Sequence, residues 1–344
     1  MKEIFDRYKD LSIAVFGDYC LDEYFWIDAA MNEPSLETGL VAYQCTKRET
    51  SPGAAGTVAK NLKNLGIGTV YAVGFVGDDG RGLELCKGLD KLNANREHLI
   101  ITQDRATPAY TKPWLMENGK TEELNRIDIK NWTPTPAHLE DELIAQLKSV
   151  VGKVDALLIM DQVAETGCGV VTDKVRAAIS EVAKQSSLLI YADSRDRIGL
   201  FEGIMVKGNQ FELTHAIYGY ADDGADTPVK LAADPTAQRT EKEIDHACET
   251  LFKKNNRPVI CTMGELGARI YHDGPRIDIP AVEVKGQTDV TGGGDMFTAA
   301  FMSALAGGAD KAVAGRAGNI AAAICVQQLG SSGYVTAEDI LKQI

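Results

Sequence analysis

Short aliphatic runs alternate with longer amphipathic segments through most of the chain. Such runs are typical of buried strands, and apolar residues that recur every three or four positions are typical of helices. The predicted strands are Ile13–Phe16, Val70–Val76, Ala156–Met160, Leu188–Ala192, Ile204–Lys207 and Val259–Thr262. The predicted helices are Ala54–Leu65, Gly82–Leu92, Ala137–Val150, Val170–Gln185, Glu241–Lys254, Gly294–Ala306 and Lys311–Gln328. This alternation predicts an α/β fold, with a doubly wound, mostly parallel sheet and helices on both faces.

Two segments, residues 21–50 and 106–129, break the alternation. In the second, Ala109–Leu115 and Glu123–Ile127 are predicted as hairpin strands around Asn118-Gly119. We expect both segments to form a small β lid over the carboxyl ends of the strands, where ligands of open α/β sheets bind. The whole chain, residues 1–344, is then one domain with two lid insertions. The acidic stretch Tyr220–Asp234 is predicted to be a loop.

The composition of the chain argues against several classes of function. The chain has 344 residues and a formal net charge of −13, which opposes binding to a phosphate backbone, so we expect no nucleic-acid partner. The apolar runs are far shorter than the roughly 20 residues of a membrane helix. Residues 1–16 also lack the pattern of a signal peptide, so we expect a cytoplasmic protein without a membrane partner. Seven scattered cysteines without a Cys-x-x-Cys pair fit reduced thiols.

The segment Gly292-Gly293-Gly294-Asp295, followed by an apolar helix, is the strongest candidate for chemistry. Consecutive glycines let backbone N–H groups converge on one point, and a helix N-terminus adds partial positive charge, so the segment can hold an anion. Asp295 stands beside that anion, where a carboxylate can accept a proton from an attacking hydroxyl group. Taken alone, the same pattern also fits a carboxylate that only caps a helix.

The longer segment Asp289–Phe297 resembles the C-terminal signature of the PfkB, or ribokinase, family of sugar kinases. The resemblance continues in the same order through Gly17–Asp18, Pro52–Gly56, Gly74–Gly80, Arg126–Asp128, Asp193–Arg195, Asn209–Glu212, Thr262–Ala268 and Gly318–Ala323. Gly17–Tyr24 and Leu124–Asp128 are most similar to kinases of heptose 7-phosphate. The resemblance implies an ATP- and Mg2+-dependent kinase that phosphorylates a hydroxyl group of a sugar or sugar phosphate, heptose 7-phosphate among them. It also implies a homodimer.

The resemblance assigns roles to individual residues. Asp295 is implied to be the base, with the N–H groups of Gly292, Gly293 and Gly294 stabilising the transferring phosphoryl group. The nucleotide side is implied to comprise Asn209, Thr262, Gly264, Gly267 and Asn319. Asn209 and Glu212 match the element that organises Mg2+ through its waters, although the pair also fits a capping box. Asp289 and Thr291 match a site for a monovalent cation such as K+.

For the acceptor sugar, the implied residues are Asp18, Gly53, Thr57, Asn61 and Arg126, with Lys60 on the adjoining helix. Thr57 stands where heptose kinases have an asparagine, so a kinase of another sugar or of a nucleoside stays an alternative. The basic residues Arg105, Lys112, Arg126 and Arg195 either hold a substrate phosphate or serve as solvated or paired charges.

Two further alternatives come from other classes. A catalytically silent binding or regulatory protein of this fold has no need for the complete set of cradle glycines, Asp295, Asn209 and Glu212. A dinucleotide-binding dehydrogenase is disfavoured because Gly17-Asp18-Tyr19-Cys20 follows the first strand in place of a G-x-G-x-x-G turn.

Overall fold

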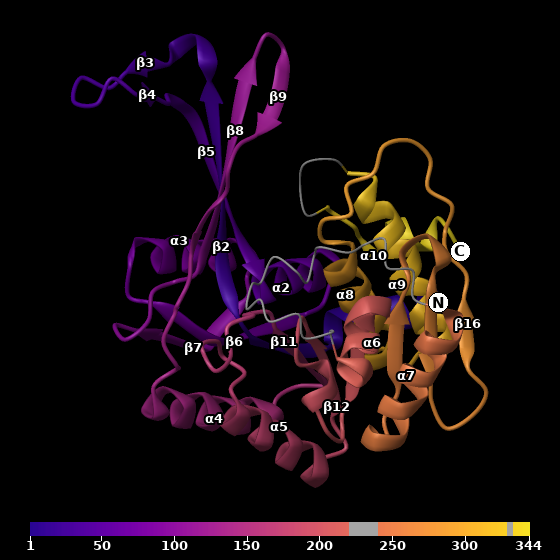
Figure 1. Cartoon of the computed structure of the whole chain (residues 1–344). Helices are drawn as coiled ribbons and strands as arrows, with labels where there is room; N and C mark the ends of the chain where they lie inside the picture. The colour runs from indigo at the N-terminus through magenta and orange to yellow at the C-terminus, as the bar shows by residue number, and fades with distance from the viewer. Residues whose placement is uncertain (220–239, 329–332) are drawn as a thin grey trace.

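The computed structural model describes residues 1–219, 240–328 and 333–344 (Figure 1). The predicted loop Tyr220–Asp234 lies outside the described residues. Within the described ranges, no helix combines the length and apolar character that crossing a bilayer requires.

A nine-stranded sheet runs through the main body of the molecule. Its strands are β1 (Ser12–Gly17), β6 (Thr69–Gly77), β7 (Asn95–Thr102), β11 (Ala156–Asp161), β12 (Leu189–Ser194), β13 (Met205–Asn209), β14 (Val259–Thr262), β15 (Ala268–Tyr271) and β16 (Ile277–Ile279). Their order is β16-β15-β14-β13-β12-β11-β1-β6-β7, and all pairs are parallel except those made by β15 and β16. The chain moves outward from β1 to β7 and then returns beside β1 at β11. This reversal opens a crevice at the carboxyl ends of β1 and β11, as expected of a doubly wound sheet.

Helices cover both faces of this sheet, and each face has its own buried apolar cluster. One face carries α2 (Ala55–Asn64), α3 (Gly80–Lys91), α8 (Gly293–Ala306) and α9 (Lys311–Val326), together with the short α1 (Lys2–Asp6) and α10 (Ala337–Leu341). The other face carries α4 (Ala137–Val151), α5 (Asp173–Gln185), α6 (Gln210–Tyr218) and α7 (Glu241–Asn255). In α4, Leu139, Leu143, Leu147 and Val150 recur at helical spacing and are all buried, which confirms the apolar periodicity.

A second, five-stranded sheet projects from the main body (Figure 1). It comprises β2 (Tyr19–Asp28), β5 (Cys45–Ala54), β8 (Ala109–Glu117), β9 (Lys120–Glu123) and β10 (Ile127–Ile129). At its tip, β3 (Glu33–Pro34) and β4 (Val41–Ala42) form a two-stranded arm. The two segments that break the helical alternation therefore do combine in one small sheet. The hairpin return strand, however, is β9 and not Glu123–Ile127, because the chain leaves β8 after Glu123 and rejoins it lower down as β10.

The base of the small sheet is fastened to α3 by one buried carboxylate. Glu23 of β2 accepts hydrogen bonds from Arg48 Nη2 at 2.6 Å, Arg81 Nε at 3.0 Å and Thr111 Oγ1 at 2.7 Å. Arg48 also pairs with Glu84 of α3 at 2.8 Å. Since these residues come from β2, β5, β8 and α3, the lower part of the projecting sheet is held against the main body.

Candidate active site

The glycine segment begins α8 at the carboxyl edge of the main sheet. Gly292 is the N-cap residue, with a left-handed φ of 79°. The N–H of Gly293 donates to Val290 O at 3.3 Å, which differs from its predicted role toward a ligand. In the described structure the N–H groups of Gly292 and Gly294 have no acceptor. These two N–H groups and the helix N-terminus form an anion cradle, the name used below for Gly292–Gly294.

Asp295 lies in the first turn of α8, beside the cradle. Burial is the largest cause that raises its pKa, to about 7, and Asp193 raises it further. Lys207 and Arg195 lower the same pKa, and Asp22 raises it, so all four charged groups lie close enough to act on Asp295. A carboxyl group with a pKa near neutrality is suited to accept a proton at physiological pH.

Two neighbouring strands place an ion pair beneath the cradle. Asp193 of β12 is the register partner of Lys207 of β13, and Lys207 Nζ lies 2.7 Å from Asp193 Oδ2. Asp193 is therefore not the partner of Arg195. The exposed Arg195 lies near Asp295 and Glu212, and it lowers the pKa of both carboxyl groups.

Asn209 and Glu212 form a complete capping box at the start of α6. Asn209 Oδ1 accepts from the backbone N–H of Phe211 and Glu212, and Glu212 Oε2 accepts from the backbone N–H of Asn209 at 2.7 Å. Burial raises the pKa of Glu212 to about 7, an effect that Lys207 opposes and Asp193 reinforces. A divalent cation would favour the ionised carboxylate at this position, so the pair fits Mg2+ as well as the cap.

On the predicted nucleotide side, Thr262 and Gly264 lie at the end of β14. Thr262 is the last residue of the strand, and its hydroxyl donates to Gly208 O at 3.5 Å. Gly264 has a φ of 56°, and no atom lies within 4 Å of the position that its Cβ would take. The backbone at Gly264 is therefore open to a ligand.

Gly267 and Asn319 serve the packing of β16 instead. A Cβ at Gly267 would lie 2.1 Å from Ile279 O, so this glycine permits a close approach of two chain segments. Asn319 Nδ2 donates to Ile279 O at 3.2 Å and to Pro280 O at 3.0 Å. Both residues therefore have a structural role in the chain, and their direct contacts with a nucleotide stay predictions.

Asp18 also has a role other than the predicted one. Its Oδ2 accepts from the N–H of Gln162 at 2.8 Å and of Val163 at 3.0 Å, and its Oδ1 accepts from the N–H of Val170 at 2.7 Å. Burial raises the pKa of Asp18 to about 6 although these hydrogen bonds lower it. The carboxylate thus fixes the loop 162–170. Its contact with a sugar stays a prediction.

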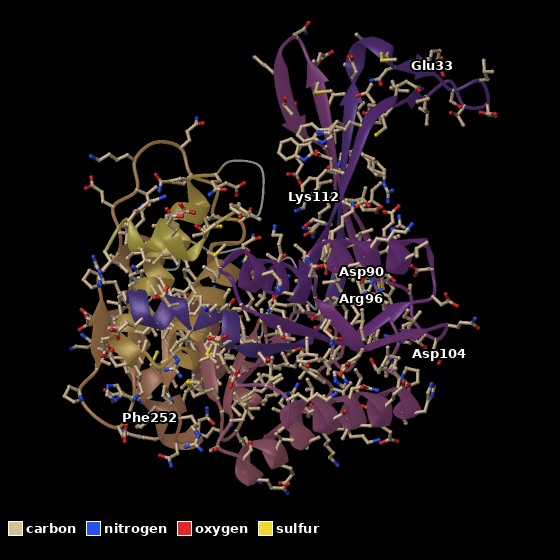
Figure 2. The ribbon with its side chains drawn as sticks, turned by 180° about the vertical axis from the view of Figure 1, so that it is seen from behind. Glu33, Asp90, Arg96, Asp104, Lys112 and Phe252 are labelled. Carbon is tan, nitrogen blue, oxygen red and sulfur yellow. The ribbon has the colours of Figure 1, made fainter. Side chains whose placement is uncertain are left out.

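Asp22, which the sequence analysis missed, is a second carboxylate near the residues expected to bind the acceptor. It lies on β2, and its Oδ2 would be 2.5 Å from a Cβ at Gly53, so that glycine makes room for the carboxylate. Burial raises the pKa of Asp22, whereas Lys112, Lys60 and Arg126 lower it. We call Asp22 and these three cations the acceptor cluster. Lys112, labelled in Figure 2, lies where the projecting sheet nears the main body.

Two cations of the acceptor cluster contact other side chains of the small sheet or its edge. Arg126 pairs with Asp128 at 2.7 Å and stacks over the Tyr110 ring, and its side chain is about half exposed. Lys112 Nζ lies 5.1 Å from the centre of the Tyr24 ring. A signal for this cluster exists in the sequence, since Asp22 directly follows the apolar start of β2, Tyr19–Leu21.

Three other predicted contacts are buried in the chain. Thr57 is 5% exposed, and its hydroxyl donates to Pro52 O at 3.4 Å. Asn61 is 1% exposed, and its Oδ1 has no hydrogen-bond partner among the described residues. Arg105 is also buried and donates to backbone carbonyl groups, among them Cys168 O at 2.9 Å. None of these side chains is presented to a ligand in this conformation.

Asp289 and Thr291 lie together in an exposed turn before α8, where Asp289 Oδ1 accepts from the N–H of Thr291 at 2.9 Å. The monovalent cation implied for this turn stays a prediction.

Structural comparison finds the same fold in solved sugar kinases. The ribokinase of Arabidopsis thaliana, solved with ribose and ATP, has a TM-score of 0.66 and 19% identity, and the match covers 96% of this chain and 98% of that one. Phosphofructokinase-2 of Escherichia coli, solved with substrates and products, has a TM-score of 0.68 and 18% identity, with 96% and 97% coverage. At this identity the likeness shows the ribokinase-like fold alone.

Sequence comparison points to the same group of enzymes. The chain is 26% identical to the bifunctional protein HldE of Bradyrhizobium sp. (strain ORS 278) and 29% identical to that of Nitrobacter winogradskyi. These matches cover 96% and 97% of this chain but 64% of each relative, so the chain spans about two thirds of their length. The sequence pattern of the pfkB family carbohydrate kinase matches residues 12–337. The chain therefore belongs to the pfkB family of carbohydrate kinases.

Proposed function

We propose that this chain transfers the terminal phosphoryl group of ATP to a hydroxyl group of a phosphorylated sugar. The observation that carries the proposal is the position of Asp295, whose pKa is near 7, beside the anion cradle and close enough to Asp22 to be affected by its charge. A base near both a phosphoryl site and a sugar-binding carboxylate has the arrangement that transfer to a hydroxyl group needs. The members of the family and the nucleotide-bound solved relative support ATP as the donor.

In this proposal Asp22 accepts a hydrogen bond from the sugar and turns one hydroxyl group toward Asp295. Asp295 takes the proton of that hydroxyl group, and the N–H groups of Gly292 and Gly294 stabilise the negative charge of the transferring group. Asn209 and Glu212 would hold Mg2+ through its waters. When bound there, the cation would neutralise charge on the nucleotide phosphates.

The cations around the acceptor position support a substrate that is itself anionic. Lys60, Lys112 and Arg126 lie near Asp22, and Arg195 lies near Asp295, in a chain whose net charge is −13. Such a local group of donors suits a phosphate already present on the sugar. Heptose 7-phosphate, implied by the resemblance of Gly17–Tyr24, is the first such compound to test. Since Asp22, Lys112 and Arg126 belong to the small sheet or its edge, that sheet would be the lid.

The test is ADP release from Mg-ATP with matched pairs of free and phosphorylated sugars, heptose 7-phosphate among them, and with nucleosides. We expect kcat/KM to be at least about 100-fold higher for one phosphorylated sugar than for its free form, because only the phosphorylated compound carries an anionic group that the cations of the acceptor cluster can bind. Arg126→Ala should reduce that preference without abolishing turnover of the free sugar.

Other outcomes decide between the alternatives. Turnover of a free sugar or nucleoside with no preference for a phosphate would support the kinase activity. It would contradict the proposal that the acceptor is a phosphorylated sugar. Binding of ATP without turnover of any compound would favour a regulatory member of the fold, and failure to bind ATP would contradict the proposal itself.

A further inference from the structure

The ion pair between Lys207 and Asp193 is buried under the anion cradle. The two side chains are 7% and 8% exposed, and Nζ lies 2.7 Å from Oδ2. Removing two charges from water costs several kcal/mol for each ion, and apolar residues of similar size often stabilise a fold as well or better. A structural need alone therefore does not explain a charged pair at this position.

The ammonium group of the pair lies next to the cradle. A Cβ at Gly294 would lie 3.2 Å from Lys207 Nζ, so this group is beside the backbone that would hold the phosphoryl group. The carboxylate of the pair also accepts from Thr298 Oγ1 at 3.4 Å, one turn further along α8. Thr298 Oγ1 in turn lies 3.2 Å from the hydroxyl of Tyr191.

Lys207 keeps donor capacity for a ligand. An ammonium group has three N–H donors, and within the described parts of the chain the only acceptor of Lys207 is Asp193. Glu212 and Asp295 both experience the charge of Lys207, so the ammonium group lies near both the predicted Mg2+ element and the predicted base. A donor that is near these groups and next to the cradle can reach the oxygens of a phosphoryl group that passes from nucleotide to sugar.

We propose that Lys207 is a catalytic residue that donates to the transferring phosphoryl group, and that Asp193 is the positioning residue that holds its ammonium group against the cradle. This inference rests on the proposed function. In the reaction, the acceptor oxygen forms a bond to phosphorus, the bond to the leaving oxygen of ADP breaks, and the hydroxyl proton passes to Asp295. Lys207 stays protonated throughout and contributes charge and hydrogen bonds that strengthen as negative charge develops.

The experiment compares Lys207→Met, Lys207→Arg and the double variant Lys207→Met with Asp193→Asn. The double variant removes both charges, so it keeps the fold testable if the single variant leaves Asp193 unpaired and unstable. The matched control removes the exposed pair of α5, Lys184→Met with Glu181→Gln, which lies 2.9 Å apart outside the site. Thermal unfolding of each full-length variant checks that the fold is intact.

Two readouts are measured. The first is kcat and KM with Mg-ATP and the acceptor. The second is calorimetric affinity for Mg-ADP with and without aluminium fluoride, which with ADP mimics the transferring phosphoryl group. We expect the double variant to lose about 100-fold to 1000-fold in kcat, with KM for ATP changed by less than about threefold. Its affinity for ADP with aluminium fluoride should fall about 100-fold, while its affinity for ADP alone stays within about threefold. Lys207→Arg should restore part of both losses.

Two results would contradict the proposed role of Lys207. A folded double variant with the kcat of the wild-type protein would overturn the role of Lys207. So would an equal loss of affinity for ADP with and without aluminium fluoride, since that pattern indicates ground-state binding only. If the wild-type protein phosphorylates no compound, the proposed function fails, and the aluminium fluoride comparison still decides whether Lys207 faces a transferring phosphoryl group.

Discussion

Asp295 is held in surroundings that disfavour its charge, which makes its replacement a test of stability as well as activity. Burial, aided by Asp193, raises its pKa from 3.8 to about 7. Above pH 7 the group is ionised in both states, and only the folded state carries the penalty of the buried charge. The difference in pKa corresponds to about 4 kcal/mol at about 1.4 kcal/mol per pKa unit. Because Asp295 is partly exposed, solvent reduces this to about 1–2 kcal/mol.

Asp295→Asn should therefore stabilise the protein by about 1–2 kcal/mol at pH 8, while turnover falls by about 100-fold or more because the base is lost. The gain should shrink as the pH falls from about 7, since the folded carboxyl group becomes protonated, and it should vanish below the ordinary pKa of 3.8. Urea unfolding at pH 8, 6 and 4, with activity measured alongside, checks both statements.

Asp79 provides a control, because its replacement should change the free energy of unfolding in the opposite direction. Burial raises its pKa, but the backbone N–H groups of Thr107 and Gly82 outweigh burial and leave the pKa below its ordinary value. Asp79→Asn should lose about 1 kcal/mol at pH 8, and the loss should fade as the pH falls through the folded pKa. If Asp295→Asn is no more stable than the wild-type protein at pH 8, or if its gain does not change with pH, the reasoning about Asp295 is wrong.

Three further predictions concern single side chains. Asp22→Asn should raise the acceptor KM about tenfold or more, because the carboxylate that accepts from the sugar is lost; steady-state kinetics with the acceptor varied would show this. Glu212→Gln should raise the Mg2+ concentration needed for half-maximal activity, and an unchanged Mg2+ titration would contradict its role. Glu23→Gln should speed amide hydrogen exchange in β2 and β8 but not in α4, as mass spectrometry would show.

The central strands and most helices could be predicted because each is a local pattern of apolar residues. All six predicted strands occur in the main sheet. The strand β7 was missed because Arg96, Glu97 and His98 interrupt its apolar pattern at the edge of the sheet. Figure 2 labels Arg96 with its ion-pair partner Asp90, which fastens the start of this strand to α3. The helix α6 was not among the predicted helices because it is short, although Asn209 and Glu212 fit the capping box that begins it.

In the candidate site, too, residues that are contiguous in the sequence could be predicted, and residues that depend on distant contacts could not. Gly292–Asp295 could be found from the sequence because the cradle and the carboxylate are contiguous. Lys207 could not, because its position depends on the register between β12 and β13. Asp18 and Asp22 are four residues apart, and Asp18 is the one that accepts from backbone N–H groups in the distant loop 162–170. A single sequence gives no information on which carboxylate that loop engages.

The two halves of the proposed reaction come from different parts of the fold. Asp295, Glu212 and Lys207 belong to α8, α6 and β13 of the main body, whereas Asp22 and Lys112 belong to the projecting sheet. Substitutions on the projecting sheet can therefore alter the preferred acceptor while the groups that act on the phosphoryl donor stay unchanged. Because of this separation, the preferred sugar can change while the transfer reaction stays the same. The strands β2 and β8 are therefore the natural target for laboratory evolution of acceptor specificity.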